Sequence, residues 1–94
     1  MATDTKSILV LARRDHTEAM RVAAGLTIFG HAVRLVFMGE PLADTPANAE
    51  MAELLELSDI TPETTVPEMA GDLKSLNSKE LGAAIAASDR VVNL

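Results

Sequence analysis

The chain has 94 residues, a length typical of a single domain, and we treat residues 1–94 as one unit. Hydrophobic residues make up 48% and charged residues 23%, a balance that excludes a disordered chain. There is no cysteine, which excludes disulfides, thiolate metal sites, cysteine nucleophiles and persulfide carriage. A net charge of −6 and only two aromatic residues, Phe29 and Phe37, argue against nucleic acid as a partner.

The charge is unevenly distributed along the chain. Residues 40–72 hold nine acidic residues and no lysine or arginine, whereas residues 1–39 hold five basic residues and three acidic ones. A solvated acidic helix face accounts for this pattern, and so does an acidic surface that meets a basic partner. The N-terminal residues are polar and no apolar stretch is long enough for a signal core or a membrane span, so we expect a cytoplasmic protein that does not contact membranes.

The first two predicted elements are a strand and a helix. Residues 8–12 form an uninterrupted apolar run, which predicts a central parallel strand buried on both faces. Asp15 followed by Glu18 resembles a capping box, so a helix is predicted over residues 17–29, ended by Gly30 in a left-handed cap. The apolar face of this helix is wider than one sheet contact requires, which indicates either a subunit interface or burial by the rest of its own chain.

The next elements continue the alternation. Residues 33–38 predict a second strand, and Thr45 followed by Pro46 predicts the start of a helix over residues 47–57. A short strand is expected at residues 64–66, stopped by Pro67, with a helical turn within residues 71–76.

The last two elements are a helix and a strand. Asn77 with Glu80 predicts a capped helix over residues 78–87, with Leu81, Ala84 and Ile85 facing inward. Residues 90–94 predict a final strand.

This order predicts an α/β fold, a small doubly wound parallel sheet of four to five strands with helices on both faces. A sheet this small leaves apolar helix surface uncovered, so a homo-oligomer is expected, most simply a two-fold dimer.

The predicted ligand-binding residues are Arg13, Arg14, His16 and Gly39, which follow the first and second strands. Ligands of open α/β sheets bind beyond the carboxyl ends of the strands, and a helix N-terminus beside two arginines favours an anion. The alternative is that the arginines are solvated and Asp15 is only a cap. No catalytic residue, metal site or cofactor is assigned: His16 lacks a neighbouring nucleophile in sequence, and His31, at a helix-to-strand turn, is expected to be structural.

Three segments resemble the DsrE/DsrF/DsrH-like family of small sulfur-relay proteins. They are the strand at residues 8–12 leading into the alanine-rich residues 15–26, the Gly-His-Ala-Val-Arg-Leu-Val-Phe-Met-Gly stretch at residues 30–39, and the Ser-Asp-Arg-Val-Val-Asn-Leu ending at residues 88–94. The resemblance implies a flavodoxin-like sheet and homo- or hetero-oligomers. It also implies that active carriers hold a persulfide on a cysteine near the end of the third strand or in the following loop, a region that reads Val-Pro-Glu-Met here, at residues 66–69.

The leading hypothesis is therefore a non-catalytic DsrE-like oligomeric protein, a structural or interaction partner linked to sulfur relay that cannot carry a persulfide itself. The main alternative is a small anion- or nucleotide-binding protein with its site at Arg13, Arg14, His16 and Gly39. An enzyme that uses His16 with Asp15 or Glu40 ranks third.

Overall fold

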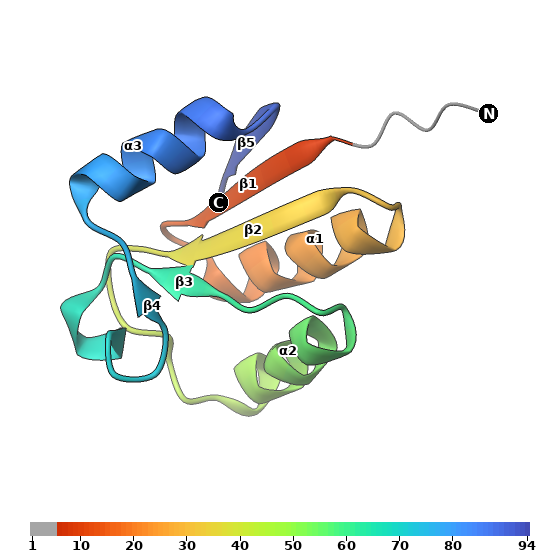
Figure 1. Ribbon diagram of the computed structural model, residues 1–94. Helices are drawn as coiled ribbons and strands as arrows, with labels where there is room; N and C mark the ends of the chain where they lie inside the picture. The colour runs from red at the N-terminus through yellow and green to blue at the C-terminus, as the bar shows by residue number, and fades with distance from the viewer. Residues whose placement is uncertain (1–5) are drawn as a thin grey trace.

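The computed structural model describes residues 6–94, and the polar residues 1–5 lie outside the described part of the chain. Five parallel strands form one sheet in the order β4-β3-β2-β1-β5. In chain order the elements are β1 (Ser7–Ala12), α1 (His16–Ile28), β2 (Ala32–Phe37), α2 (Pro46–Leu57), β3 (Glu63–Thr64), the 3₁₀ turn η1 (Pro67–Met69), β4 (Lys74–Ser75), α3 (Ser78–Ala87) and β5 (Arg90–Asn93). The predicted α/β fold with a small parallel sheet is confirmed (Figure 1).

The strand β1 lies inside the sheet, as its apolar run predicts. It pairs with β2 along its whole length, from Ser7 opposite Ala32 to Ala12 opposite Phe37, and with β5 on its other side. Leu9, Val10 and Ala12 are completely buried. Burial on both faces explains why this strand shows no alternation of polar and apolar residues.

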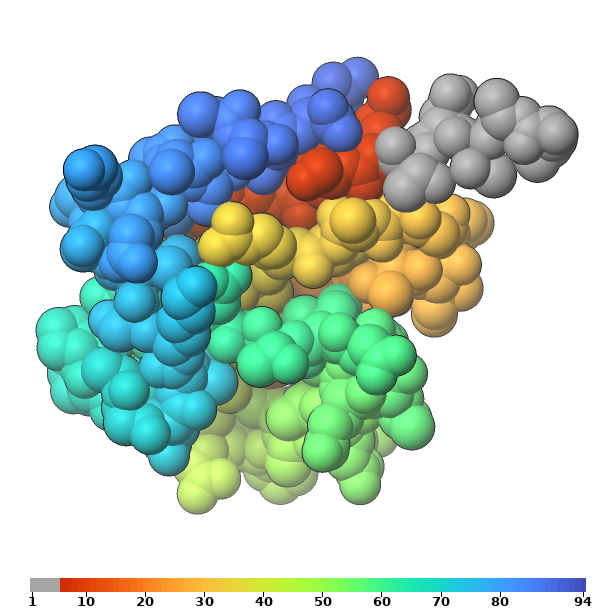
Figure 2. Space-filling model, viewed as in Figure 1, coloured from red at the N-terminus to blue at the C-terminus, as the bar shows by residue number. Residues whose placement is uncertain are grey.

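Helices cover both faces of the sheet, so the fold is doubly wound and flavodoxin-like. α1 and α2 pack together on one face, over a core built on Val10, Leu35 and Phe37. α3 lies on the other face, where Leu9, Leu11 and Val36 meet Leu76 and Ala84. Because one helix serves this second face, atoms of β2 remain at the surface beside α3 (Figure 2).

The wide apolar face of α1 has two partners within the same chain. α1 packs against β1 and β2 and also against α2, so most of its apolar residues are at least half-buried. The exceptions are its last residue, Ile28, and its C-cap, Phe29, which are 75% and 82% exposed. Burial by the rest of the chain thus accounts for the body of the helix but not for its end.

The helix ends follow the signals in the sequence. Gly30 has φ of +89°, its N–H donates to the carbonyl of Thr27, and the N–H of His31 donates to Leu26, which is the paired hydrogen bonding of a Schellman motif. Thr45 caps α2 by accepting from the N–H of Asn48. Asn77 and Glu80 form both hydrogen bonds of a capping box at α3.

The prediction for the segment between α2 and α3 was partly wrong. The third strand is Glu63–Thr64 rather than residues 64–66, because the hydroxyl of Thr64 accepts the N–H of Val66 at 2.9 Å and takes it out of the ladder. The helical turn is η1, which precedes residues 71–76, and those residues contain the strand β4. Leu76 continues β4 by donating its N–H to the carbonyl of Thr64.

Smaller corrections concern the helix bounds and one side chain. α1 begins at His16 and ends at Ile28, one residue earlier at each end than predicted. Ile85 of α3, expected to face inward, is 41% exposed, because α3 covers only part of its face of the sheet. Within residues 6–94, no helix combines the length and apolar character needed to cross a membrane.

Candidate functional site

The four predicted site residues lie at one edge of the molecule, beyond the carboxyl ends of β1 and β2. Gly39 has φ of +84°, and a Cβ atom at this position would stand 3.1 Å from the carbonyl oxygen of Arg13. The loops after β1 and β2 therefore touch through their backbones. The parallel pairing of β1 with β2 produces this meeting, as the sequence predicts.

His16, the first residue of α1, is held on two sides. Its Nε2 atom lies 3.1 Å from the carbonyl oxygen of Met38, and its ring stands edge-on to Phe37 with the ring centroids 5.3 Å apart. Because a carbonyl oxygen only accepts, Nε2 carries the proton in this contact. His16 thus joins the start of α1 to the end of β2, and its Nε2 proton is already engaged.

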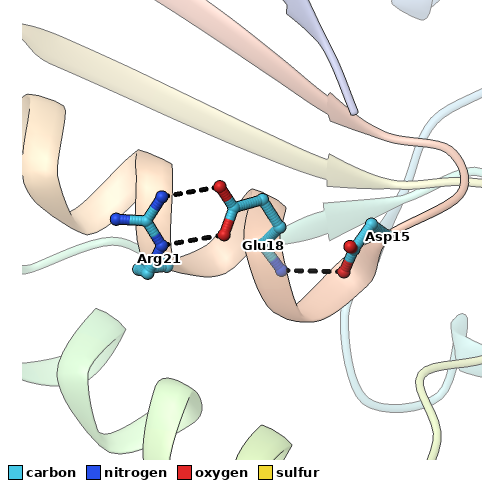
Figure 3. Close-up of polar contacts among 3 residues, drawn as sticks. All are labelled: Asp15, Glu18 and Arg21. Carbon is cyan, nitrogen blue, oxygen red and sulfur yellow. Dashed lines mark hydrogen bonds and ion pairs between the residues drawn. The ribbon is translucent and has the colours of Figure 1, made fainter.

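The N-terminus of α1 already has a carboxylate (Figure 3). Asp15 accepts a hydrogen bond of 3.0 Å from the N–H of Glu18. The Glu18 carboxylate does not complete the expected capping box, because it binds the Arg21 guanidinium through two contacts of 2.8 and 2.6 Å. The backbone N–H of Asp15 donates instead to Leu94. The hydrogen bond from Arg21 lowers the pKa of Glu18 below its ordinary value.

A hollow lies between the loop after β1 and the loop after β2, and we call it the loop hollow. It has a volume of about 340 Å³. Arg14, Asp15 and Glu40 supply its charged groups, so the two carboxylates outnumber the one guanidinium. This balance disfavours an anion in the loop hollow.

Asn48 is a lining residue that the sequence reasoning missed. It is buried, accepts a hydrogen bond of 2.5 Å from the Thr17 hydroxyl and donates from Nδ2 to the carbonyl of Ala43. These bonds tie α1, α2 and the loop before α2 together. The signal for it is an amide in the first turn of the predicted helix, three residues after the Thr45 cap.

Arg13 and Arg14 both line a second hollow, at the carboxyl ends of β1 and β5, which we call the arginine hollow. It has a volume of about 150 Å³, and its remaining lining residues are Asn93 and Leu94. The chain winds from β1 outward to β4 and then returns to place β5 on the opposite side of β1, so the direction of winding reverses here. Crevices at such a reversal are the usual ligand sites of open α/β sheets. Asn93 and Leu94 were not predicted, because the order of strands does not follow from the hydrophobic pattern.

The other groups singled out in the sequence have structural contacts. His31 accepts the backbone N–H of Lys6 through Nδ1 at 3.1 Å, in line with the structural role expected for it. Residues 66–69, at the position that the resemblance links to the carrier cysteine, run from the buried Val66 into η1. No group of three or more histidine, aspartate or glutamate side chains that could hold a metal ion occurs within residues 6–94.

Comparison of the chain with protein-family models, with curated proteins and with solved structures gave no match.

Proposed function

We propose that this chain is a non-catalytic oligomeric protein related to the DsrE-like class, a structural or interaction partner in sulfur relay that does not carry the persulfide itself. Three stretches that resemble the family support the relation, together with the small parallel sheet. The missing thiol supports the non-catalytic role, because sulfur carriage needs a nucleophilic thiolate.

The observation that carries the oligomer is a set of exposed apolar side chains, which we call the apolar end. Ile28, Phe29 and Leu57 are 75%, 82% and 83% exposed. They stand at the C-terminal ends of α1 and α2, which lie at the same side of the molecule (Figure 1). Burying a large apolar side chain contributes about 1.5–3 kcal/mol, so contact between two apolar ends stabilises a symmetric dimer.

Substitution at the apolar end tests this proposal. The Phe29→Ser, Leu57→Ser double variant removes two of the three side chains, and light scattering should then report a monomer. The matched control is Ile85→Ser, which changes an exposed apolar residue of α3 on the other face of the sheet and should keep the mass of the unaltered protein. Equal masses for the double variant and the unaltered protein would rule out this interface.

A second candidate function is the binding of a small anion or nucleotide, supported by the arginine hollow. Arg13 and Arg14 both line the hollow at the reversal between β1 and β5, and its lining has no aspartate or glutamate. Guanidinium groups suit phosphate and sulfate oxygens. In this candidate His16 and Gly39 shape the neighbouring loops rather than contact the anion.

Thermal unfolding separates the two candidates. An anion at 100 times its Kd stabilises the folded chain by about 2.7 kcal/mol, a rise in Tm of about 10 °C or more for a domain of this size. Sulfate, phosphate and nucleotides are the probes. The Arg13→Ala, Arg14→Ala variant should lose the effect, while Lys74→Ala, Lys79→Ala makes the same change in net charge at exposed positions and should retain it. No rise in Tm with any of these anions removes the second candidate.

A further inference from the structure

A cavity with an almost entirely apolar lining lies away from both hollows, and nothing in the proposed function uses it. It has a volume of about 360 Å³ and opens between α2, the segment that precedes β3 and the segment that leads into β4. In Figure 1 α2 is the lower helix, the segment before β3 is the green loop that runs back from the end of α2, and the segment before β4 is the loop below that strand. A cavity of this size falls within the range of small-molecule sites.

The floor of the cavity is apolar and buried. Met20 of α1, Phe37 of β2 and Leu55 of α2 line it, and each is at most 2% exposed. The walls are half-buried side chains, Leu42 and Met69 among them. Two methionines in such a lining adapt to the shape of an aliphatic ligand.

The rim of the cavity is acidic. Glu56 of α2 and Asp72 of the segment before β4 line the cavity, both are exposed, and the lining has no basic residue. The surrounding residues 40–72 carry nine acidic and no basic side chains. The potential at the mouth is therefore negative, which attracts cations and repels anions.

We propose that this cavity binds a small aliphatic amine, with the hydrocarbon chain on the floor of Met20, Phe37 and Leu55 and the ammonium group between Glu56 and Asp72. An amine of this class is protonated at neutral pH, since its pKa is close to that of a lysine side chain. The apolar end does not line the cavity, so this binding is independent of the oligomer.

A matched series of probes with one chain and three head groups tests the proposal: n-octylamine, 1-octanol and octanoate. Binding is followed by the NMR shifts of the methionine methyl groups, because Met20 and Met69 line the cavity whereas Met38 and Met51 do not. Octylamine should shift Met20 and Met69 in a saturable manner and bind about fivefold more tightly than octanol, as expected for two exposed ion pairs. Octanoate should bind more weakly than octanol.

Two pairs of variants test where the hydrocarbon chain of the ligand lies and which carboxylates contact its ammonium group. Ala52→Phe places a ring at the cavity from an exposed position of α2 and should abolish binding, while Ala49→Phe, exposed on the same helix but outside the lining, should not. Glu56→Gln, Asp72→Asn should reduce the affinity for octylamine to that for octanol. Glu50→Gln, Glu53→Gln makes the same charge change at exposed positions of α2 outside the lining and should retain most of the preference for the amine.

Three results would overturn the proposal. The first is the absence of saturable octylamine binding, which is also the result expected if only a side chain of a partner protein fits the cavity. The second is equal affinity for octylamine and octanol. The third is an equal loss in the two double charge variants, which would indicate general attraction to an acidic surface.

Discussion

Gly39 stands where the two loops of the candidate site touch, and its conformation is demanding in two respects. Its φ of +84° lies in the left-handed region, and the Arg13 carbonyl oxygen occupies the space that a side chain would need. Gly30 has a similar φ of +89° but open space around it. Substituting each glycine in turn therefore separates the free-energy cost of a side chain at positive φ from the free-energy cost of its contact with the Arg13 carbonyl oxygen.

We predict that Gly30→Ala destabilises the fold by about 1 kcal/mol, the ordinary cost of a side chain in the left-handed region. Gly39→Ala should cost about 2 kcal/mol or more, because the Cβ atom also displaces the loop after β1. Urea unfolding of the two variants measures the difference. Equal destabilisation would show that the loops do not press against one another at this point.

Glu18 provides a prediction for pH at the residue scale. The hydrogen bond from Arg21 lowers the pKa of Glu18, so this carboxylate stabilises the folded state above its ordinary pKa near 4.5, and the contribution is lost as pH falls through the lowered value. An NMR titration should give Glu18 a pKa below the ordinary value of a glutamate side chain. In Arg21→Gln the pKa of Glu18 should return toward that ordinary value, and an unchanged pKa would contradict the ion pair.

The helices and strands differ in how far the sequence predicts them. Thr45 and the Asn77–Glu80 pair predict the starts of two helices. These starts can be predicted because the hydrogen bonds that make the caps join residues only three positions apart. β3 and β4 have two residues each and no pattern of their own. They are held by long-range contacts, such as the Thr64 hydroxyl bond to the Phe37 carbonyl, which a local pattern does not contain.

The same division applies to the candidate site. The meeting of the loops after β1 and β2 follows from one strand-helix-strand unit, so Arg13, His16 and Gly39 could be brought to one edge on sequence grounds. The arginine hollow depends on β5 returning beside β1, a choice of strand order that the alternation of elements leaves open. The hydrogen bond between His16 and the Met38 carbonyl likewise depends on how α1 is positioned against the sheet.

An ion pair links β3 to the neighbouring strand β2. Arg34 of β2 makes two contacts of 2.9 Å with the Glu63 carboxylate, whose side chain is only 12% exposed. The hydrogen bond that Arg34 donates to the Glu63 carboxylate raises the pKa of Arg34, so the guanidinium stays charged. Removing one partner leaves a largely buried charge without compensation.

We predict that Arg34→Met destabilises the chain by about 2 kcal/mol, and that the Arg34→Met, Glu63→Met double variant recovers part of the loss because no buried charge remains. Chemical denaturation measures both. A single variant as stable as the unaltered protein would show that the pair behaves as a solvated surface contact.

At the scale of the whole molecule, the two faces of the sheet and the two ends of the helices are covered unequally. α1 and α2 bury one face of the sheet, and α3 buries part of the other. The apolar end remains exposed, although the preceding turns of α1 and α2 are packed against the core. The sequence predicts this incompleteness, since four or five strands with three helices leave apolar surface uncovered. It does not predict where the uncovered surface lies, because that depends on how α1 and α2 run side by side.

The mass of the unaltered protein in solution tests the proposed oligomer most directly. Light scattering or sedimentation equilibrium should give about twice the chain mass of 10.0 kDa, or a higher whole multiple, at micromolar concentration. A mass equal to that of one chain at every concentration would contradict the account.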